Sequence, residues 1–494
     1  MSSSGSSHTS NEDPSVDSLA SSNAEVELLE PIEYYEPGGV HPIKIDTVLQ
    51  GANSSYRIVA KLGWGSFSTV WLVKCCGSSR WAALKICRAD SPPLHEVAML
   101  RYVNAGSAAP HVSTLLDNFT IHGPNGTHTV IVMDVVTPVQ KEIVYFWRGN
   151  ASALKAIARS VVDAVAHVHA GGVAHGDLHF NNIAFVKPWL EDDDPKFAEF
   201  VAKPTLFPVF SCGADVEIDP HIPPYITREV HLVTYERLSL PRGQSPSRVK
   251  LLDFGSARCL SDADGVLEKC HEQIRSPEWL LGPSTTRMAT TASDVWALGL
   301  AIYRIMACDM PLNFGGLMGI ARYSGVVPTS WLASDAWNDL FKPDSFEVSA
   351  AQADELWAKA SSDYLRENCA SDDEAFALVR LLRRCLSLDP ADRPSAADIL
   401  MDPWFASEEQ YTINALVVPS TDLRYATRAF ALAGYPIITM LLGFLGDEEE
   451  SAPANPVRAY GPGMPFRLSF IGMAWQQATT EYLSGGYRRL RSGM

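Results

Sequence analysis

Short apolar runs alternate with turn residues in the first third of the chain. Three runs, rich in valine, leucine, isoleucine and tryptophan, occupy residues 56–60, 69–73 and 81–86. A second set, on either side of a Gly-Pro-Asn-Gly turn at residues 123–126, occupies residues 113–121 and 128–135. Runs of this length between turn residues are typical of strands. The pattern predicts an antiparallel meander followed by a further strand pair.

After residue 150 the apolar positions follow a helical period. Those between Leu154 and Val168 fall on one face, Ser152 can cap the helix, and Gly171-Gly172 can end it. Residues 294–306 are apolar nearly all round, which predicts a buried helix, and residues 376–385 predict another. The chain is therefore expected to have an α+β, bilobal fold: a small antiparallel β-rich lobe, a larger helical lobe, and a ligand site between them.

The length of 494 residues allows one large bilobal domain with flanking segments. We expect a disordered Ser-rich tail at residues 1–32 and an extension of unknown role at residues 406–494. The domain between them has lobes at about 33–136 and 137–405, and an acidic, proline-containing insertion at 186–248. Apolar residues make up 46% and charged residues 20%, which excludes a wholly disordered, collagen-like or coiled-coil chain.

The charge balance narrows the class of partner. With 40 Lys and Arg against 57 Asp and Glu, the net charge of −17 disfavours nucleic acids and suits a basic protein partner. Nine cysteines without a CxxC pair indicate reduced thiols in the cytoplasm, the nucleus or both, and argue against a zinc site. Residues 1–30 lack the apolar core of a signal peptide. The uncharged stretch 429–446 is expected to pack on protein, with a membrane span as the alternative. We expect a monomer.

Two glycines in a turn between two expected strands give the first chemical signal. Because glycine has no Cβ, such a turn lets backbone N–H groups approach a phosphate. An ordinary hairpin turn is the alternative, and a Rossmann motif is excluded because a strand follows. The candidate binding residues are Leu62, Gly63, Trp64, Gly65, Ser66, Phe67, Ser68, Thr69 and Val70.

A lysine among apolar neighbours gives the second signal. Lys85 lies in a predicted strand, and such a lysine usually has a charged partner. The candidate partner is Glu96 in the helical run 95–102, and the pair would hold the ammonium against phosphates. The alternative is a surface lysine and a solvated glutamate.

Two later loops carry oxygen ligands. Asp177 and Asn182 lie five residues apart in the sequence HGDLHFNN, and Asp253 follows the apolar strand 249–252. Asp177 can accept a proton from an attacking hydroxyl, while Asn182 and Asp253 suit a divalent ion that bridges phosphates. Each loop alone is common, but their order after the glycine turn and Lys85 predicts one site.

These motifs, in this order, resemble those of the eukaryotic protein kinases over about residues 33–405. Residues 276–278 (SPE) resemble the APE motif, and residues 294–299 (DVWALG) resemble the DxWxxG helix. Residues 33–42 and 61–72 are similar to signatures of the SR-protein kinases and their fungal relatives. That subfamily also carries an insertion where residues 186–248 lie.

The resemblance implies ATP and Mg²⁺ as cofactors and adds roles for further residues. Val70 and Ala83 would enclose the adenine, and Asp134 and Val136 would offer backbone groups to its edge. Met133 would be the gatekeeper, although a plain core methionine is the alternative. The resemblance also implies a structural ion pair between Glu278 and Arg393.

Two positions depart from the kinase pattern. Gly176 replaces an arginine that normally pairs with an activation-loop phosphate, so we expect activity without loop phosphorylation. His179 replaces the catalytic-loop lysine, so turnover is expected to depend on pH. His179 remains a catalytic candidate beside Asp177, Lys85 and Glu96.

The resulting hypothesis is a serine/threonine kinase that transfers the γ-phosphate of ATP to basic, Arg/Ser-rich proteins. One alternative is a small-molecule phosphotransferase, because aminoglycoside- and choline-kinase-like enzymes carry a similar HGDLH loop. The other is a catalytically weak, kinase-like scaffold, for which Ser68, Gly176 and His179 are the arguments.

Overall fold

The computed structural model describes most of the chain between residues 29 and 406. The described residues are 29–78, 80–91, 93–142, 146–187, 190, 194–210, 219–239, 248–262, 270–282, 287–332, 337, 348–406, 415–420, 437–444 and 465–472. They fall into two compact units, Met1–Tyr235 with Ser247–Asp402, and Glu236–Pro246 with Pro403–Met494. All but the last four residues of the predicted tail 1–32 lie outside the described residues.

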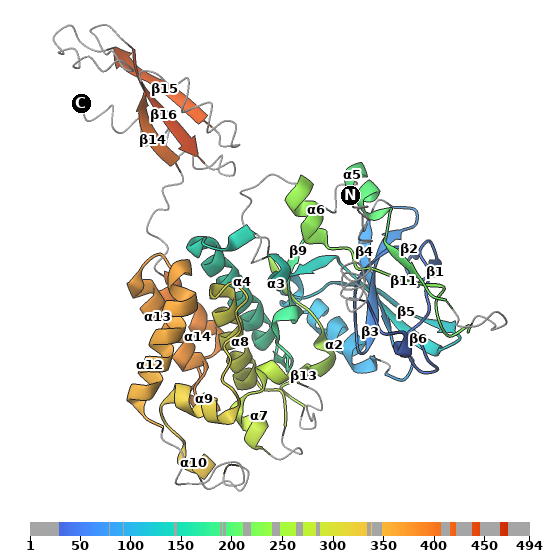
Figure 1. Ribbon diagram of the computed structural model, residues 1–494, viewed down its shortest axis with the longest axis horizontal. Helices are drawn as coiled ribbons and strands as arrows, with labels where there is room; N and C mark the ends of the chain where they lie inside the picture. Colours follow the sequence, from blue (N-terminus) through green and yellow to red (C-terminus); the bar gives the residue numbers. More distant parts are fainter. Residues whose placement is uncertain are drawn as a thin grey trace, which may run out of the picture. The chain divides into compact units, whose positions relative to one another are not determined.

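The small lobe of the first unit is a six-stranded sheet, with helix α2 (Leu94–Ala105) packed on strand β5 (Figure 1). The strand order is β1-β2-β3-β4-β6-β5, and every neighbouring pair is antiparallel. The strands are β1 (Val48–Gln50), β2 (Ser55–Gly65), β3 (Ser68–Cys75), β4 (Trp81–Cys87), β5 (Leu115–Gly123) and β6 (Gly126–Met133). The predicted meander and strand pair are confirmed.

Alternation along these strands separates two apolar groups. Ile58, Trp71, Val73, Leu84 and Val132 belong to one buried cluster. The intervening positions, such as Leu72 and Ala83, belong to a different cluster. A strand sends successive side chains to opposite faces, so the sheet is covered on both.

Helices α4 (Ala151–Ala170) and α8 (Thr291–Met306) pack together in the large lobe, and α13 (Asp372–Cys385) packs on α8 (Figure 1). The predicted buried helix is α8, in which eleven of sixteen residues are buried. Among the described residues, the large lobe also contains α3 (Val139–Glu142), α7 (Pro277–Leu281), α9 (Leu317–Ser324), α10 (Thr329–Leu332), α12 (Ala350–Ala360) and α14 (Ala396–Leu400).

The predicted cap of α4 was wrong. The helix begins at Ala151, and Asn150 is its N-cap, with its side-chain oxygen accepting from the Ala153 backbone N–H at 3.0 Å. Asn150 and Ser152 are both good capping residues, and the apolar pattern did not distinguish them. The predicted end at Gly171 is confirmed.

A small sheet of order β12-β9-β7 brings together three strands that are far apart in the sequence. It contains β7 (Val136–Pro138), β9 (Ile183–Val186) and β12 (Val249–Leu251). Strands β9 and β12 pair antiparallel, with Phe185 opposite Val249. The predicted insertion is therefore the loop of a hairpin, and its described part holds α5 (Pro195–Val201), β10 (Leu206–Pro208), β11 (Tyr225–Thr227) and α6 (Leu232–Ser239).

The second unit contains α15 (Pro403–Ala406) and a three-stranded antiparallel sheet of order β14-β16-β15. Its strands are β14 (Ala415–Ser420), β15 (Ile437–Phe444) and β16 (Pro465–Gly472). The described part of the apolar stretch 429–446 is thus a strand. Among the described residues, no helix is both long and apolar enough to cross a membrane.

Candidate active site

Lys85 on β4 and Glu96 on α2 form a buried ion pair. The Lys85 ammonium lies 2.7 and 2.9 Å from the two Glu96 carboxylate oxygens, and the side chains are 13% and 5% exposed. Its nitrogen is also 3.8 Å from an Asp253 oxygen. Burial alone would lower the pKa of Lys85, but the Glu96 and Asp253 carboxylates outweigh burial and raise this pKa. The predicted contact is confirmed, and Lys85 keeps its charge at neutral pH.

The glycine turn joins β2 to β3. Gly65 pairs with Ser68 across the turn, and Gly63 pairs with Val70. A Cβ added at Gly65 would meet nothing within 4 Å, and one at Gly63 would meet only a Glu229 oxygen at 3.7 Å. The turn therefore leaves open space at the backbone, as a phosphate-binding turn requires.

The expected adenine-binding positions lie together. Leu62, Val70 and Ala83 belong to one hydrophobic cluster, and Ala83 pairs with Met133 across strands β4 and β6. The Asp134 carboxylate accepts hydrogen bonds from Lys250 Nζ at 2.6 Å and from the Thr114 backbone N–H at 2.7 Å. The Asp134 backbone N–H donates to the Thr114 carbonyl oxygen at 3.3 Å, so the Asp134 carbonyl oxygen is the backbone group left to serve a ligand.

The insertion completes the same cluster, which the sequence did not predict. Phe197 of α5 and Tyr235 of α6 are buried there with Leu190, Val201 and Leu232. The Phe197 ring packs edge-on against Trp81 of β4, with ring centroids 5.2 Å apart. The insertion is thus packed against the strands that carry Val70 and Ala83.

A main-chain contact also fixes the insertion to β2. The Val230 backbone N–H donates to the Lys61 carbonyl oxygen at 2.7 Å. The Lys61 side chain is fully buried, pairs with Glu30 and lies over the Trp71 ring, 4.7 Å from its centroid. Lys61 directly precedes the glycine turn, so the insertion is bonded to strand β2 just before that turn.

A buried carboxylate holds the start of the catalytic loop. Asp294 of α8 accepts from the backbone N–H groups of His175 and Gly176 at 2.7 and 2.9 Å, and from His169 Nε2 at 2.9 Å. Gly176 has φ +77°, and an added Cβ would lie 2.4 Å from the Ser256 carbonyl oxygen. No larger side chain fits there, which explains the departure at this position.

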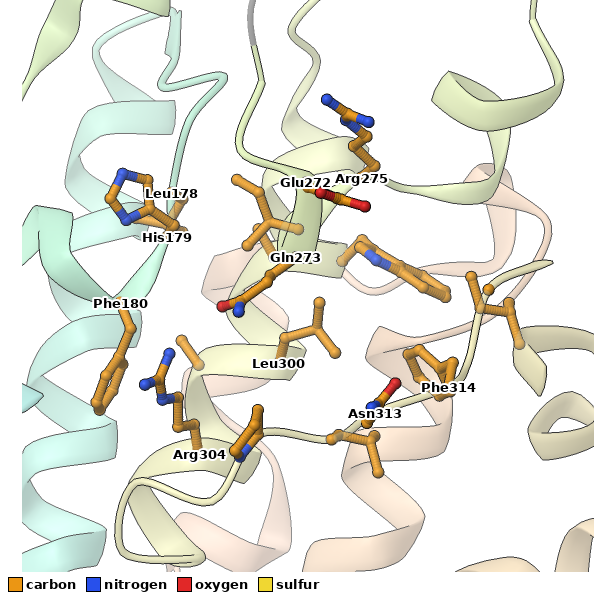
Figure 2. A pocket seen from close by; sticks show the side chains of 18 of the residues that line it. Leu178, His179, Phe180, Glu272, Gln273, Arg275, Leu300, Arg304, Asn313 and Phe314 are labelled. Atoms are coloured by element: carbon orange, nitrogen blue, oxygen red, sulfur yellow. The ribbon is translucent and has the colours of Figure 1, made fainter. Parts of the chain in front are cut away.

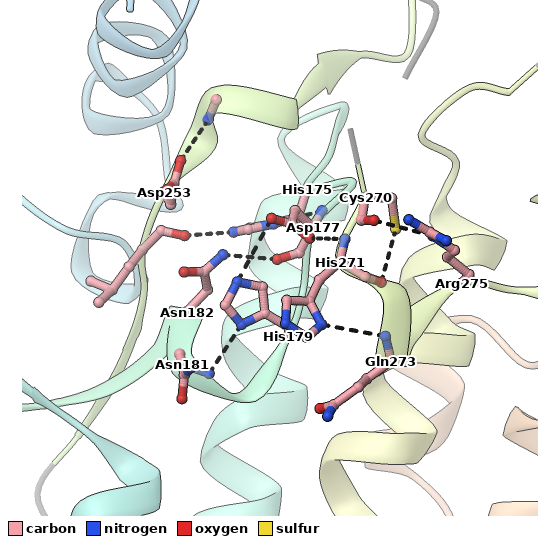
Figure 3. Close-up of polar contacts among 12 residues, drawn as sticks. His175, Asp177, His179, Asn181, Asn182, Asp253, Cys270, His271, Gln273 and Arg275 are labelled. Carbon is pink, nitrogen blue, oxygen red and sulfur yellow. Dashed lines mark hydrogen bonds and ion pairs between the residues drawn. The ribbon is translucent and has the colours of Figure 1, made fainter. Parts of the chain in front are cut away.

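The structure brings the predicted oxygen ligands together (Figure 3). The Asn182 amide donates to the Asp177 carbonyl oxygen at 2.9 Å, which leaves the amide oxygen of Asn182 for a metal ion. The Leu252 N–H donates to the Asn182 carbonyl at 2.8 Å, so Asp253 is tied close to Asn182. The Lys85 ammonium lowers the pKa of Asp253, so its carboxylate stays ionised.

A histidine from the segment just before the SPE motif also contacts the catalytic loop (Figure 3). The His271 backbone N–H donates to Asp177 Oδ1 at 2.9 Å, and its ring lies 4.7 Å from the His179 ring, centroid to centroid. His179 Nε2 is 3.7 Å from Asp177 Oδ2. Burial lowers the pKa of His179, and the Asp177 carboxylate only partly opposes it. Sequence reasoning missed His271, because no motif links it to a residue 94 positions away.

The SPE segment is anchored as predicted. The Arg393 guanidinium donates to both Glu278 carboxylate oxygens at 2.8 and 2.7 Å, and to the Ser387 and Ala292 carbonyl oxygens at 2.9 Å each. The Arg393 side chain is fully buried. A bidentate pair of this kind fixes direction as well as distance.

A pocket of about 470 Å³ adjoins the catalytic loop (Figure 2). Leu178, His179 and Phe180 form one side, and Arg275 and Arg304 also line it. The Arg304 guanidinium lies over the Phe180 ring and pairs with Asp309 at 2.7 Å. The pocket begins at the loop that carries Asp177, so a chain bound there is close to that carboxylate.

Comparison with known proteins agrees with this geometry. Residues 240–405 match the protein kinase domain family. The serine/threonine-protein kinase spk-1 of Caenorhabditis elegans is 34% identical over 163 residues, or 30% of this chain. The match spans 16% of that protein's length, and 14% of its Caenorhabditis briggsae counterpart.

Two further relatives extend the comparison. SKY1 of Saccharomyces cerevisiae is 32% identical over 31% of this chain and 22% of its own length. The serine/threonine-protein kinase SRPK of Physarum polycephalum is 24% identical over 76% of this chain and 90% of its own. The first unit thus has the bilobal protein kinase fold. Within that class, the chain is similar to SRPK-type kinases, which confirms the resemblance inferred from the motifs.

Proposed function

We propose that the chain is a serine/threonine protein kinase that transfers the γ-phosphoryl group of Mg·ATP to a protein hydroxyl. The observation that carries the proposal is the convergence of Lys85, Asp177, Asn182 and Asp253, which are remote in sequence. The relatives are named serine/threonine-protein kinases, which supports this choice of acceptor.

The donor set fits a magnesium ion, which Asn182 and Asp253 would hold. The Asn182 amide oxygen and the Asp253 carboxylate are hard oxygen ligands, which Mg²⁺ prefers. When bound, the ion neutralises charge on the phosphates. Lys85, held by Glu96, orients phosphate oxygens, and the open turn at Gly63 and Gly65 covers them with backbone N–H groups.

Asp177 positions the acceptor hydroxyl. The hydroxyl oxygen attacks the γ-phosphorus, and the bond to the leaving diphosphate oxygen breaks. Asp177 accepts the proton of the hydroxyl. The His271 N–H keeps Asp177 Oδ1 oriented for this role. His179 supplies an Nε2 hydrogen-bond donor where a lysine would supply a full charge, because its Nδ1 accepts from the Asn181 N–H at 3.3 Å.

A basic, Arg/Ser-rich protein is the proposed substrate. The similarity to SRPK-type kinases and the net charge of −17 both support it. The test supplies labelled ATP with an Arg/Ser repeat peptide or a generic basic protein, and compares wild type with Asp177→Asn. We expect transfer to the repeat peptide that the variant loses.

Two results would replace this proposal. ATP binding without transfer to any protein would identify a scaffold. Phosphorylation of choline or an aminoglycoside, without transfer to protein, would identify a small-molecule phosphotransferase.

A further inference from the structure

We propose that His111, Asp163 and His167 form a binding site for a divalent transition-metal ion, of which zinc suits the ligands best. The cluster lies where the short 3₁₀ helix η2 (Ala109–His111) packs on α4. None of its residues belongs to the Lys85–Asp253 site, so the proposal does not depend on kinase activity.

The positions of the ligand atoms are the first argument. One atom from each of the three side chains lies within 4.8 Å of the other two. His111 Nδ1 is 3.6 Å from Asp163 Oδ2, and His167 Nδ1 is 3.5 Å from Asp163 Oδ1. Zinc bonds of about 2.0–2.2 Å in tetrahedral geometry place neighbouring ligand atoms about 3.3 Å apart. His167 Nδ1 also donates to the Asp163 carbonyl oxygen at 2.9 Å, so His167 must release this hydrogen bond, or ligate through Nε2, to close the site.

The backbone already provides this arrangement. Asp163 and His167 are four residues apart on α4, so they lie on one face of the helix, and His111 approaches from another element. The Asp163 and His167 side chains are 41% and 40% exposed, whereas His111 is 14% exposed. An ion can enter from solvent and keep water at its open position. Two histidines and one carboxylate are a ligand set that zinc accepts.

The two imidazole rings set the conformational change that binding requires. Their centroids are 4.0 Å apart and their planes 15° apart. Because a ring nitrogen ligates in the plane of its own ring, at least one ring must turn before both can bind one ion. His167 is 40% exposed on its side of the pair, so it is the ring with room to turn.

A metal here would cross-link η2 and α4, two elements that both contact strand β12. Directly after η2, the Ser113 N–H donates to the Leu251 carbonyl of β12 at 2.9 Å. The Val249 N–H of the same strand donates to Ser160 Oγ of α4 at 3.2 Å. Strand β12 leads to Asp253, and η2 follows α2, which carries Glu96. Metal binding would therefore raise the thermal stability of the region around the nucleotide site.

The test titrates zinc chloride into the chelator-stripped full chain and measures bound zinc by equilibrium dialysis, with the melting temperature followed in parallel. Cobalt(II) serves as a spectroscopic probe, because its visible absorption reports histidine ligation and coordination number. The variants are His111→Ala and the half-exposed His167→Gln, which is the safer choice if burial makes His111→Ala unstable. His122→Gln, at an exposed histidine of β5, is the matched control.

We expect the wild type and the His122 variant to bind one zinc ion that both cluster variants bind at least about tenfold more weakly. The melting temperature should rise with zinc only in the first two proteins. Equal zinc affinity in wild type and His167→Gln would overturn the proposal, since any remaining binding would then belong to other residues such as the cysteines. An unchanged cobalt spectrum in that variant would overturn it as well.

Discussion

The catalytic loop and the insertion both shape the candidate nucleotide site, but they do so by different physical means. The loop is held by directional hydrogen bonds from its backbone to buried Asp294. The insertion is held by apolar contacts of Phe197 and Tyr235 in the cluster that includes Ala83, beside a backbone hydrogen bond from Val230. Polar residues with fixed chemical roles leave a readable motif, whereas many apolar residues can fill a packing site. The comparison predicts that loop substitutions abolish the chemical step and that insertion substitutions weaken nucleotide binding.

The largest effect is expected at Lys85, a polar residue with a fixed chemical role. Lys85→Met removes the ammonium that organises phosphate oxygens and should lower kcat by at least about 10²- to 10³-fold. Steady-state kinetics with an Arg/Ser peptide measure the change, and exposed Lys203→Met in the insertion is the control. Near wild-type kcat with normal ATP binding would remove Lys85 from the site.

Phe197→Ala tests whether apolar packing of the insertion supports nucleotide binding. Phe197 is 1% exposed, and truncating a buried phenylalanine costs about 3–5 kcal/mol of packing free energy. We expect a several-fold higher KM for ATP, a smaller change in kcat, and a lower melting temperature. Phe210→Ala, at an insertion residue that is 83% exposed, should change none of these values. An unaltered KM in the Phe197 variant would show that the insertion does not support nucleotide binding.

His179 allows a test of charge within the loop. Burial lowers its pKa below the usual 6.5, so the ring loses its charge as pH rises toward about 6.5, and wild-type kcat should fall over that range and level off above it. His179→Lys keeps its charge over this range, because lysine loses its proton only near pH 10. The ratio of variant to wild-type kcat should therefore rise with pH, by up to about tenfold per unit. A ratio that stays constant would mean that the charge of His179 does not matter.

The smallest expected effect concerns Gly176. No side chain at this position can pair with a loop phosphate, since even a Cβ would overlap the Ser256 carbonyl oxygen. Phosphatase treatment of the active protein should leave kcat within about twofold of the untreated value. Mass spectrometry confirms that phosphate has been removed. Loss of turnover in the dephosphorylated protein would contradict the prediction.

The sequence predicted those features that follow from a local pattern of apolar residues or from a recognisable motif. The strands around Lys85 and the helix α8 followed from alternation and helical period, because burial selects those patterns. The pair Lys85–Glu96 and the pair Glu278–Arg393 followed from chemistry and resemblance.

Other features required the folded chain. The contact of His271 with Asp177 joins residues 94 positions apart through a backbone N–H, which carries no side-chain signature. The burial of Phe197 and Tyr235 was equally hidden, because prolines and acidic residues weaken the apolar period of the insertion. The choice of Asn150 over Ser152 as a cap depended on a geometry that either residue type satisfies.

Because β9 pairs with β12, the distance between the proposed metal ligands does not depend on how many residues lie between the two strands. Asn182 directly precedes β9 and Asp253 comes two residues after β12, so the pairing of Phe185 with Val249 sets their distance in space. Lengthening a hairpin loop adds little closure entropy. This loop is therefore a place where new sequence can be acquired or exchanged during evolution while the reaction centre stays as it is.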